Sequence, residues 1–298
     1  MMFSVSASST WHSTFAEDLR SYRAAGVDGI GIWEFKLTGP DEESVAALRI
    51  SGLRPTVCWP RVPGPLTVDP LFPGPRRAED RTRLLCASIR RLAAFEPLAV
   101  ACLAEGDLGG RTVAEARAVV VASLREAALV AEEVGVRLAL EVIRPGPGAN
   151  LSTTITDVLG LVHDIGVDNV DVLIDTWHFW DSPVAPEEIA RHGGSVIAVQ
   201  VNDFPAGSRG WYDRALPGSG VMPLPAILAA LEASGFDGPY ELELFSDDGP
   251  LGTRDPQSFA VRHAAQFLTL ARDGFAEAWQ DRSAAPEWRM PPGSGHAT

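Results

Sequence analysis

The chain has 298 residues, 46% of them hydrophobic, and its 25 Lys and Arg against 39 Asp and Glu give a formal net charge of −14. This length fits two domains of about 150 residues each or one α/β barrel of about 250 residues. The negative charge argues against binding to nucleic-acid phosphates or anionic membranes, because both need a basic surface. The N-terminus lacks a signal-peptide pattern, and no segment approaches the roughly 18–20 apolar residues of a membrane span.

The three cysteines, Cys58, Cys86 and Cys102, are an odd number and show no Cys-x-x-Cys spacing. They predict neither a disulfide framework nor a thiolate metal site. Because free thiols are typical of a reducing compartment, we expect a cytoplasmic protein.

Eight short apolar runs alternate along the chain with longer segments of helical period. The runs occupy residues 3–7, 27–35, 54–59, 97–105, 136–143, 170–175, 195–204 and 239–245. They are nearly continuous in apolar residues rather than alternating with polar ones. This pattern is typical of strands in a parallel sheet that is covered by helices on both faces.

The segments between the runs carry helix start and stop signals. Helices are predicted at residues 14–26, 112–135, 153–166 and 223–235, and each of these ranges ends in glycine. Thr112 and Glu115 have the spacing of a capping box. The repeat predicts a single-domain (β/α)8 TIM barrel over residues 1–280. A doubly wound open sheet is the alternative, but no glycine-rich phosphate loop follows any run.

Two stretches depart from the repeat. Residues 60–75 are rich in Pro and Gly and follow the third run. They predict a long ordered loop or a lid, with a plain spacer as the alternative. Residues 281–298 are predicted to form a partly disordered C-terminal tail.

Polar side chains occur in each of the four late apolar runs. Glu141 lies near the end of the fifth run, Asp175 ends the sixth, Gln200 lies in the seventh and Glu243 in the eighth. In a barrel the strand ends meet at one mouth, where active sites lie. Four oxygen donors with three negative charges suit a hard divalent cation. A lone carboxylate of this kind is usually a cap or an ion-pair partner, but four in register are harder to explain in that way.

Further polar residues accompany these four. Glu241 faces the same side of its strand as Glu243, because the two are two residues apart. Glu243 lies nearer the mouth of the barrel, so Glu243 is the predicted ligand. His178, just beyond the sixth run, is a candidate ligand, proton shuttle or hydrogen-bond donor. Arg214 is a candidate substrate contact, with a solvated surface charge as the alternative. Glu34 and Glu105 end two early runs and could bind substrate hydroxyls; for Glu34, pairing with a nearby lysine or a capping role is the alternative.

Six of the eight tryptophans lie at run ends or in the loops that follow them: Trp11, Trp33, Trp59, Trp177, Trp180 and Trp211. Such a rim suits stacking against a ring or an apolar ligand face, so we expect a cyclic or glycosylated small-molecule substrate that contacts Trp59 and Trp177. The alternative is that these aromatic side chains only cap the barrel mouth. No cluster of basic residues supports a phosphorylated substrate.

At these positions the chain resembles the sugar phosphate isomerase/epimerase superfamily, the xylose-isomerase-like TIM barrels. The matching segments are LALEV around Glu141, DTWHFW at 175–180, VQVND at 199–203, RALPGSGVMPL at 214–224 and GFDGPYELELF at 235–245. The resemblance implies that a divalent metal is held by Glu141, Asp175, Gln200 and Glu243. It also implies that His178 and Arg214 bind substrate and that Glu141 and Glu243 form the acid/base pair.

Gln200 departs from the superfamily, in which most members have His at this position. The substitution resembles the bacterial 3-dehydroshikimate dehydratase branch. Because an amide oxygen is a harder ligand than imidazole, Mn or Mg is favoured, with Co or Zn as alternatives. The endonuclease IV branch fits poorly, because it needs many histidine ligands and a basic face for DNA.

The leading hypothesis is a metal-dependent isomerase or epimerase that acts on a sugar or polyol-like hydroxy-ketone through an enolate. One alternative is a metal-dependent dehydratase of the 3-dehydroshikimate type, a lyase. Another is a catalytically silent barrel that serves as a partner subunit. Dimers and tetramers are common on this fold, so a homo-oligomer stays an open alternative.

Overall fold

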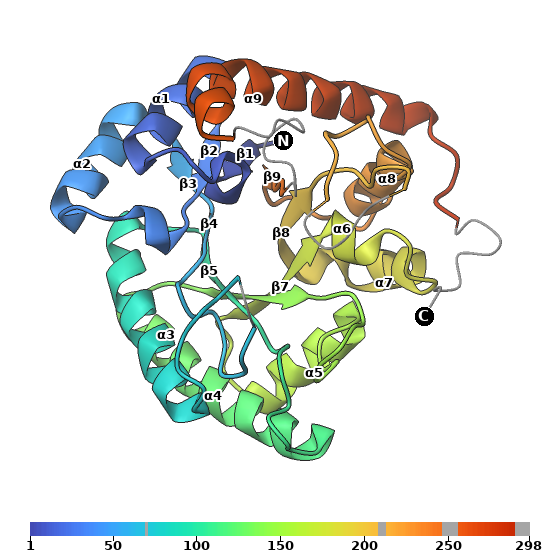
Figure 1. The fold of residues 1–298 in the computed structure, drawn as a ribbon. Helices are drawn as coiled ribbons and strands as arrows, with labels where there is room; N and C mark the ends of the chain where they lie inside the picture. The colour runs from blue at the N-terminus through green and yellow to red at the C-terminus, as the bar shows by residue number, and fades with distance from the viewer. Residues whose placement is uncertain (69–70, 208–212, 246–255, 290–298) are drawn as a thin grey trace.

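The computed structural model describes residues 1–68, 71–207, 213–245 and 256–289, without the side chains of 256–265. Its strands are all parallel and form a barrel, in the order β3-β2-β1-β9-β8-β7-β6-β5-β4 (Figure 1). They are β1 (Phe3–Ser6), β2 (Gly29–Gly31), β3 (Arg54–Pro55), β4 (Val57–Cys58), β5 (Ala99–Cys102), β6 (Leu138–Val142), β7 (Val170–Asp175), β8 (Val196–Val201) and β9 (Tyr240–Leu242). The predicted single-domain TIM barrel is confirmed.

The third predicted run divides into two short strands and closes the ring. β3 pairs with β2, and β4 pairs with β5. Thr56 joins the two strands: its N–H donates to Ile30 O at 2.9 Å, and its carbonyl accepts from Ala99 N at 3.4 Å. Each of the eight apolar runs therefore supplies one strand position of the barrel, and the third run fills its position with β3 and β4 together.

Most of the helices form an outer layer around the strands, and α6 (Thr176–Phe179) lies inside this layer at the end of β7 (Figure 1). The others are α1 (Phe15–Ala25), α2 (Asp41–Ser51), α3 (Ala78–Leu92), α4 (Val113–Val134), α5 (Ile155–Ile165), α7 (Ala185–His192), α8 (Leu224–Ala233) and α9 (Pro256–Asp281). The predicted capping box of α4 is confirmed, with Thr112 and Glu115 bonded reciprocally, and Gly135 ends the helix in the left-handed conformation. Among the described residues, no helix combines the length and apolar character that crossing a bilayer requires.

Small side chains line much of the barrel interior. Ala99 and Ala101 of β5, Ala139 of β6 and Ala198 of β8 are all fully buried and belong to one inner cluster. TIM-barrel interiors are usually filled by bulky branched residues. Alanines in their place leave room inside this barrel for long polar side chains.

The segment that follows β4 is fixed against the segment that follows β5. Leu103 N donates to Pro63 O, and Asp107 N donates to Thr67 O, each at 2.9 Å. A Cβ atom on Gly64 would lie 2.2 Å from Leu103 O, so only glycine permits this close approach. The described part of the predicted 60–75 loop is thus held against the segment that follows β5 at Pro63, Gly64 and Thr67. Residues 69–70 lie outside the described chain.

The end of the chain returns to the barrel. After α9 a short 3-10 helix, η6 (Arg282–Ala284), leads to Trp288, which is 5% exposed. The Trp288 ring contacts Phe179 of α6 edge-on, with ring centroids 6.3 Å apart. The first part of the predicted tail therefore packs on the barrel, and residues 290–298 lie outside the described chain.

Candidate active site

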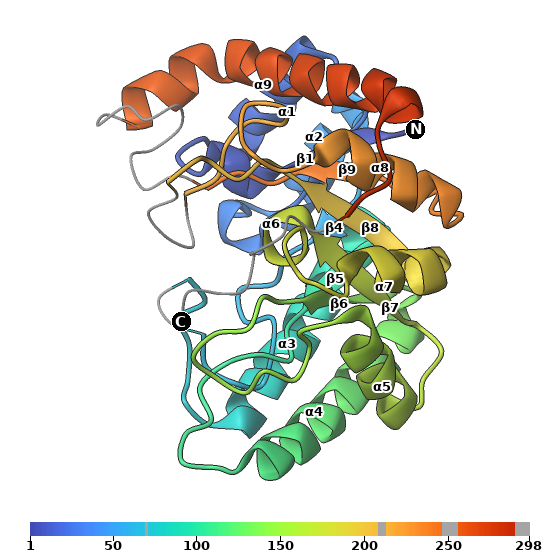
Figure 2. The ribbon, with the colours of Figure 1, turned by 90° about the vertical axis from the view of Figure 1, so that its right-hand side faces the viewer.

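A cavity of about 610 Å3 opens at the carboxyl ends of the strands. The loops that follow the strands gather at this end of the barrel, on the left in Figure 2. One side of the cavity is charged and is lined by Glu141, Arg144, His178, Arg214 and Glu243. The other side is apolar and is lined by Trp33, Trp59, Val68, Leu71, Phe72, Leu103 and Phe245.

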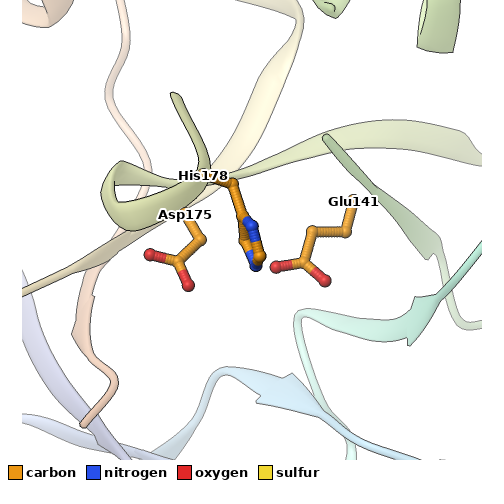
Figure 3. Close-up of side chains that lie close together, drawn as sticks. All are labelled: Glu141, Asp175 and His178. Carbon is orange, nitrogen blue, oxygen red and sulfur yellow. The ribbon is translucent and has the colours of Figure 1, made fainter. Parts of the chain in front are cut away.

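The charged side contains a group that could hold a metal ion. Glu141 of β6, Asp175 at the end of β7 and His178 of α6 each offer a ligand atom, and these atoms lie within 4.8 Å of one another. Figure 3 shows the two carboxylates on either side of the His178 ring. All three residues are buried. They converge because β6 and β7 are neighbours in the parallel sheet and α6 begins where β7 ends.

Asp175 is held firmly in place. Its Oδ1 accepts hydrogen bonds from Trp177 N at 2.9 Å and from Asn202 Nδ2 at 2.8 Å. Its Oδ2 lies 2.6 Å from Arg214 Nη1. Asn202 was not singled out from the sequence, although a polar residue at the end of an apolar run is the same signal that identified the carboxylates.

The two glutamates differ in how they are held. Glu243 accepts from Ser6 Oγ at 3.2 Å, from Gln200 Nε2 at 2.9 Å and from Arg214 Nη1 at 3.0 Å. No described residue donates a hydrogen bond to the Glu141 carboxylate. Burial raises the pKa of Glu141 well above its usual range, and the charges of Glu243 and Asp175 add to the increase. Burial raises the pKa of Glu243 as well, to about 8, so the two glutamates differ mainly in that Glu141 is the less constrained carboxylate.

Arg214 is buried among the acids, with a side chain only 4% exposed, and is not the solvated charge that was its alternative interpretation. Its Nη1 contacts both Asp175 and Glu243. One guanidinium cannot balance three buried carboxylates. Electrostatics alone therefore favour a further cation at this site.

Gln200 gives an independent sign that a cation fits. Its Oε1 is buried and has no hydrogen-bond partner among the described residues, although its Nε2 has two. A buried acceptor without a donor costs free energy unless a ligand satisfies it. An orphaned amide oxygen beside three carboxylates is a donor set for Mg or Mn.

His178 is held as a neutral ring. Burial lowers the pKa of His178 to about 3, and the nearby charges of Arg214 and Arg144 act in the same direction, whereas Asp175 opposes them. Arg144 N donates to His178 Nδ1 at 3.4 Å. This contact leaves the proton on Nε2, which makes His178 a hydrogen-bond donor through that atom.

The aromatic side of the cavity is a stack. The rings of Trp33, Trp59 and Phe72 are mutually stacked with centroids 5.3 to 5.6 Å apart, and Trp11 packs on Trp33. Trp33 Nε1 donates to Ser6 Oγ at 2.8 Å, so this stack connects with the residue that bonds Glu243. The predicted aromatic rim thus lies partly at the cavity; Trp211 falls outside the described residues.

Two of the predicted substrate contacts lie elsewhere. Glu34 is not among the described residues that line the cavity; it accepts from Ser88 Oγ at 2.7 Å and pairs with Arg91 at 3.2 Å. Lys36, the suggested partner of Glu34, pairs instead with Asp18.

Trp177 is also absent from the described cavity lining. Its ring packs under two guanidinium groups, with Arg144 at 4.9 Å and Arg214 at 5.6 Å from the ring centroid. Trp177 therefore positions these arginines, and direct contact with substrate does not follow from its place.

Glu105 does line the cavity. Its Oε1 accepts from Ser152 N at 2.7 Å and from Ser152 Oγ at 3.1 Å, and it also accepts from Leu151 N. Arg144, which also lines the cavity and is anchored by Asp181, was not singled out from the sequence. The only available signal was its place directly after a strand.

The barrel with an acidic mouth defines the class of protein. A family model described as xylose isomerase-like TIM barrel matches residues 19–270, and the chain belongs to this family. The resemblance of the sequence to the sugar phosphate isomerase/epimerase superfamily is thereby confirmed.

Curated relatives are similar over part of the chain. An inosose isomerase of Bacillus velezensis is 32% identical over 126 residues, which are 41% of this chain and 44% of that protein. An inosose isomerase of Bacillus licheniformis is 30% identical over 126 residues, 41% of this chain and 45% of that protein. The chain thus matches less than half the length of these relatives.

Solved structures share the fold over nearly the whole chain. An IolI protein with a bound zinc atom has a TM-score of 0.76 at 19% identity, covering 95% of this chain and 99% of that one. YcjR of E. coli, a 3-keto-D-glucoside 4-epimerase, has a TM-score of 0.70 at 18% identity, covering 90% of this chain and 99% of that one. The TM-scores establish a common fold, and at identities this low the similarity shows the fold alone.

Proposed function

We propose that this protein is a divalent-metal-dependent isomerase or epimerase of a cyclic, sugar-like or polyol-like hydroxy-ketone. The observation that carries the proposal is the buried group of carboxylates at the barrel mouth: ligand atoms of Glu141 and Asp175 lie within 4.8 Å of each other, and Arg214 Nη1 contacts both Asp175 and Glu243. Inosose isomerases among the relatives and epimerases among the solved structures support the same class of activity.

The metal ligands in this proposal are Glu141, Asp175, Gln200 and Glu243. Their oxygen atoms favour Mn or Mg, although the zinc atom in the IolI structure keeps zinc as an alternative. A divalent cation at this site supplies Lewis-acid polarisation of a substrate carbonyl. His178 remains outside the ligand set because its Nδ1 accepts from Arg144 N, and its proposed role is to donate from Nε2–H to a substrate oxygen.

Glu141 is the proposed general base. It takes the proton from the carbon next to the substrate carbonyl and leaves an enolate, a role suited to a carboxylate that accepts no hydrogen bond from the described residues. Glu243 is the proposed acid on the opposite side, held in one orientation by Ser6, Gln200 and Arg214. Return of the proton to the other face gives an epimer, and return to the neighbouring carbon gives an isomer.

The lining of the cavity favours an uncharged ring. Its ionisable side chains are Glu105, Asp107, Glu141 and Glu243 against Arg144 and Arg214. Both guanidinium groups already pair with carboxylates, Arg144 with Asp181 and Arg214 with Asp175 and Glu243, which disfavours a phosphate or carboxylate substrate. The stacked Trp33, Trp59 and Phe72 offer an apolar face to a ring, and 610 Å3 lies within the range of about 300–1,000 Å3 for small-molecule sites.

Proton exchange tests this proposal directly. Cyclic keto-polyols and 3-keto-glycosides would be incubated in deuterated water with the protein and Mn, and deuterium at the carbon next to the carbonyl would be followed by NMR. We expect exchange with at least one of these substrates, its loss in Glu243→Gln, and its retention in Asp107→Asn, a lining carboxylate outside the cluster. Absence of exchange in the Mn-loaded wild type with every substrate would overturn the proposal.

A dehydratase is the second candidate function, and Gln200 favours it because that residue resembles the 3-dehydroshikimate dehydratase branch. With 3-dehydroshikimate, a dehydratase forms an aromatic product that is detected by its ultraviolet absorbance. Absorbance growth without a recoverable epimer would establish the lyase and exclude the isomerase.

A further inference from the structure

Glu241 lies one layer below the site, inside the barrel. It is fully buried on β9, and in the parallel ladder it stands opposite Ser4 of β1 on one side and Gln200 of β8 on the other. It is not among the described residues that line the cavity. A carboxylate at this depth costs free energy, and an aliphatic residue would fill the same volume at lower cost.

Several groups hold the Glu241 carboxylate in one position. Its Oε2 accepts from Thr56 Oγ1, and Val57 N and Ser4 Oγ each lie 3.5 Å from the same atom. The barrel wall also makes space for it. A Cβ atom on Gly31 would lie 2.5 Å from both carboxylate oxygens, so this position must be glycine while Glu241 keeps its place.

The remaining oxygen of Glu241 faces Gln200. Gln200 Nε2 lies 3.4 Å from Glu241 Oε1 and 2.9 Å from Glu243 Oε1. The NH2 group of Gln200 is turned toward both carboxyl groups, each of which accepts from it, so the amide oxygen is on the other side. The orientation of the amide therefore follows from its neighbours.

This orientation has a consequence at the metal site. With Nε2 directed at the two glutamates, Gln200 Oε1 points away from them, and it is the buried oxygen that has no partner among the described residues. A metal ion needs this oxygen, because an amide NH2 has no lone pair to offer. A glutamine ligand differs from histidine in this respect, since a half-turn of its side-chain amide converts a ligand into a repulsive group.

We propose that Glu241 is a positioning residue that holds Gln200 with its amide oxygen toward the metal position. The inference rests on the proposed function, because it assigns a role at the same metal site. Glu243 alone cannot serve, since it also binds the metal in that proposal and shares its carboxylate with Ser6 and Arg214. Glu241 is not a proposed metal ligand, and its hydrogen bonds within the described part of the chain include neither Ser6 nor Arg214, so its carboxyl group has no such second role.

A double-mutant cycle tests the role. Mn affinity would be measured by titration calorimetry and by the loss of the free Mn signal in electron paramagnetic resonance, for wild type, Glu241→Leu, Gln200→Ala and the double variant. We expect Glu241→Leu to weaken Mn binding about 10- to 100-fold, the usual cost of losing a residue that orients a ligand. In the Gln200→Ala background the same change should have no further effect.

The melting temperature separates positioning from a structural role. Leu is close to Glu in volume and removes a buried carboxyl group, so Glu241→Leu should melt at or above the wild-type temperature. Asp18→Asn is the matched control: it removes a buried carboxylate that pairs with Lys36 and contacts none of the four proposed ligands. It should lower the melting temperature and leave Mn affinity unchanged.

Each outcome of the cycle either supports or overturns the positioning role of Glu241. Equal weakening by Glu241→Leu in both backgrounds, or no weakening in either, would overturn the positioning role while leaving the metal site intact. Glu241→Gln, which keeps the shape of the side chain, repeats the test if the leucine variant does not fold. A wild type that binds no Mn would instead refute the proposed function itself.

Discussion

The two sides of the cavity are built in opposite ways. The aromatic side, from β2, β4 and the segment that follows β4, is held mainly by its own packing: its rings stack, and Trp33 Nε1 has its acceptor in Ser6, whereas the buried Trp59 Nε1 has no acceptor among the described residues. The charged side, from β6 to β9, gathers three buried carboxylates around one guanidinium and leaves Gln200 Oε1 without a donor. The aromatic side lacks an acceptor for one ring N–H, whereas the charged side lacks a balancing positive charge.

This difference assigns substrate binding to the aromatic side and chemistry to the charged side. A stacked wall gains free energy from its own packing and holds a substrate at little cost. Crowded acids lose free energy until a cation or a proton arrives, which is why strongly shifted groups concentrate at functional sites. Variants on the two sides should therefore have different signatures, as the following four predictions state.

Glu141→Gln should have the largest effect. Loss of a general base lowers proton exchange by roughly 10²–10⁴-fold. The metal-free variant should nevertheless be at least as stable as wild type, because it removes a carboxyl group that is costly to bury and that also lies beside Asp175 and Glu243. NMR exchange and thermal melting measure the two effects; a less stable variant with full exchange would contradict the assignment.

Arg214→Met should lower the free energy of unfolding by about 3–5 kcal/mol without metal, because it leaves buried carboxylates without their partner. Added Mn should restore more stability to this variant than to wild type. Arg191→Met is the control, since Arg191 forms an exposed pair with Glu187 and its loss should cost well under about 1 kcal/mol. Urea unfolding with and without Mn gives both values.

The contribution of His178 to the stability of the metal-free protein should be lost in acid. The pKa of His178 falls from 6.5 to about 3 on folding, so the unfolded chain takes up a proton first and this contribution is lost as the pH falls below about 6.5. Between pH 6.5 and 5 this amounts to about 2 kcal/mol. Burial raises the pKa of Asp18 and Glu241 to about 7 and that of Glu243 to about 8, so these carboxyls act in the opposite direction. By urea unfolding in chelator, His178→Gln should lose that much less stability than wild type over this interval; an identical slope would refute the buried neutral ring.

Trp59→Phe should have the smallest effect, and on binding alone. Loss of part of a stacking surface costs about 0.5–1.5 kcal/mol, which raises KM roughly 2- to 12-fold and leaves kcat nearly unchanged. Trp180→Phe is the control, because Trp180 packs on Phe204 and is not in the described lining. A fall in kcat with unchanged KM would place chemistry on the aromatic side.

The sequence predicted the barrel because its signals are local. Continuous apolar runs mark buried parallel strands, and terminal glycines such as Gly135 mark helix ends whatever the tertiary structure. The positions of Glu141, Asp175, Gln200 and Glu243 at one mouth follow from the fold alone, since every strand points the same way.

Pairing between distant residues was not predictable in this way. The partner of Glu34 is Arg91, 57 residues later, and no local pattern distinguishes it from Lys36. Arg214 carries no mark that separates a buried guanidinium from a surface one. Trp177 was expected at the cavity because it follows a strand, but its ring turned toward two arginines instead.

Metal binding by the charged side is the central claim, and elemental analysis tests it most directly. Protein purified without chelator and then incubated with Mn would be measured by mass spectrometry, beside Asp175→Asn. We predict near-stoichiometric metal in wild type and its loss in the variant, whose neutral side chain keeps the shape of Asp175. Equal metal content in both proteins, or none in either, would contradict the account.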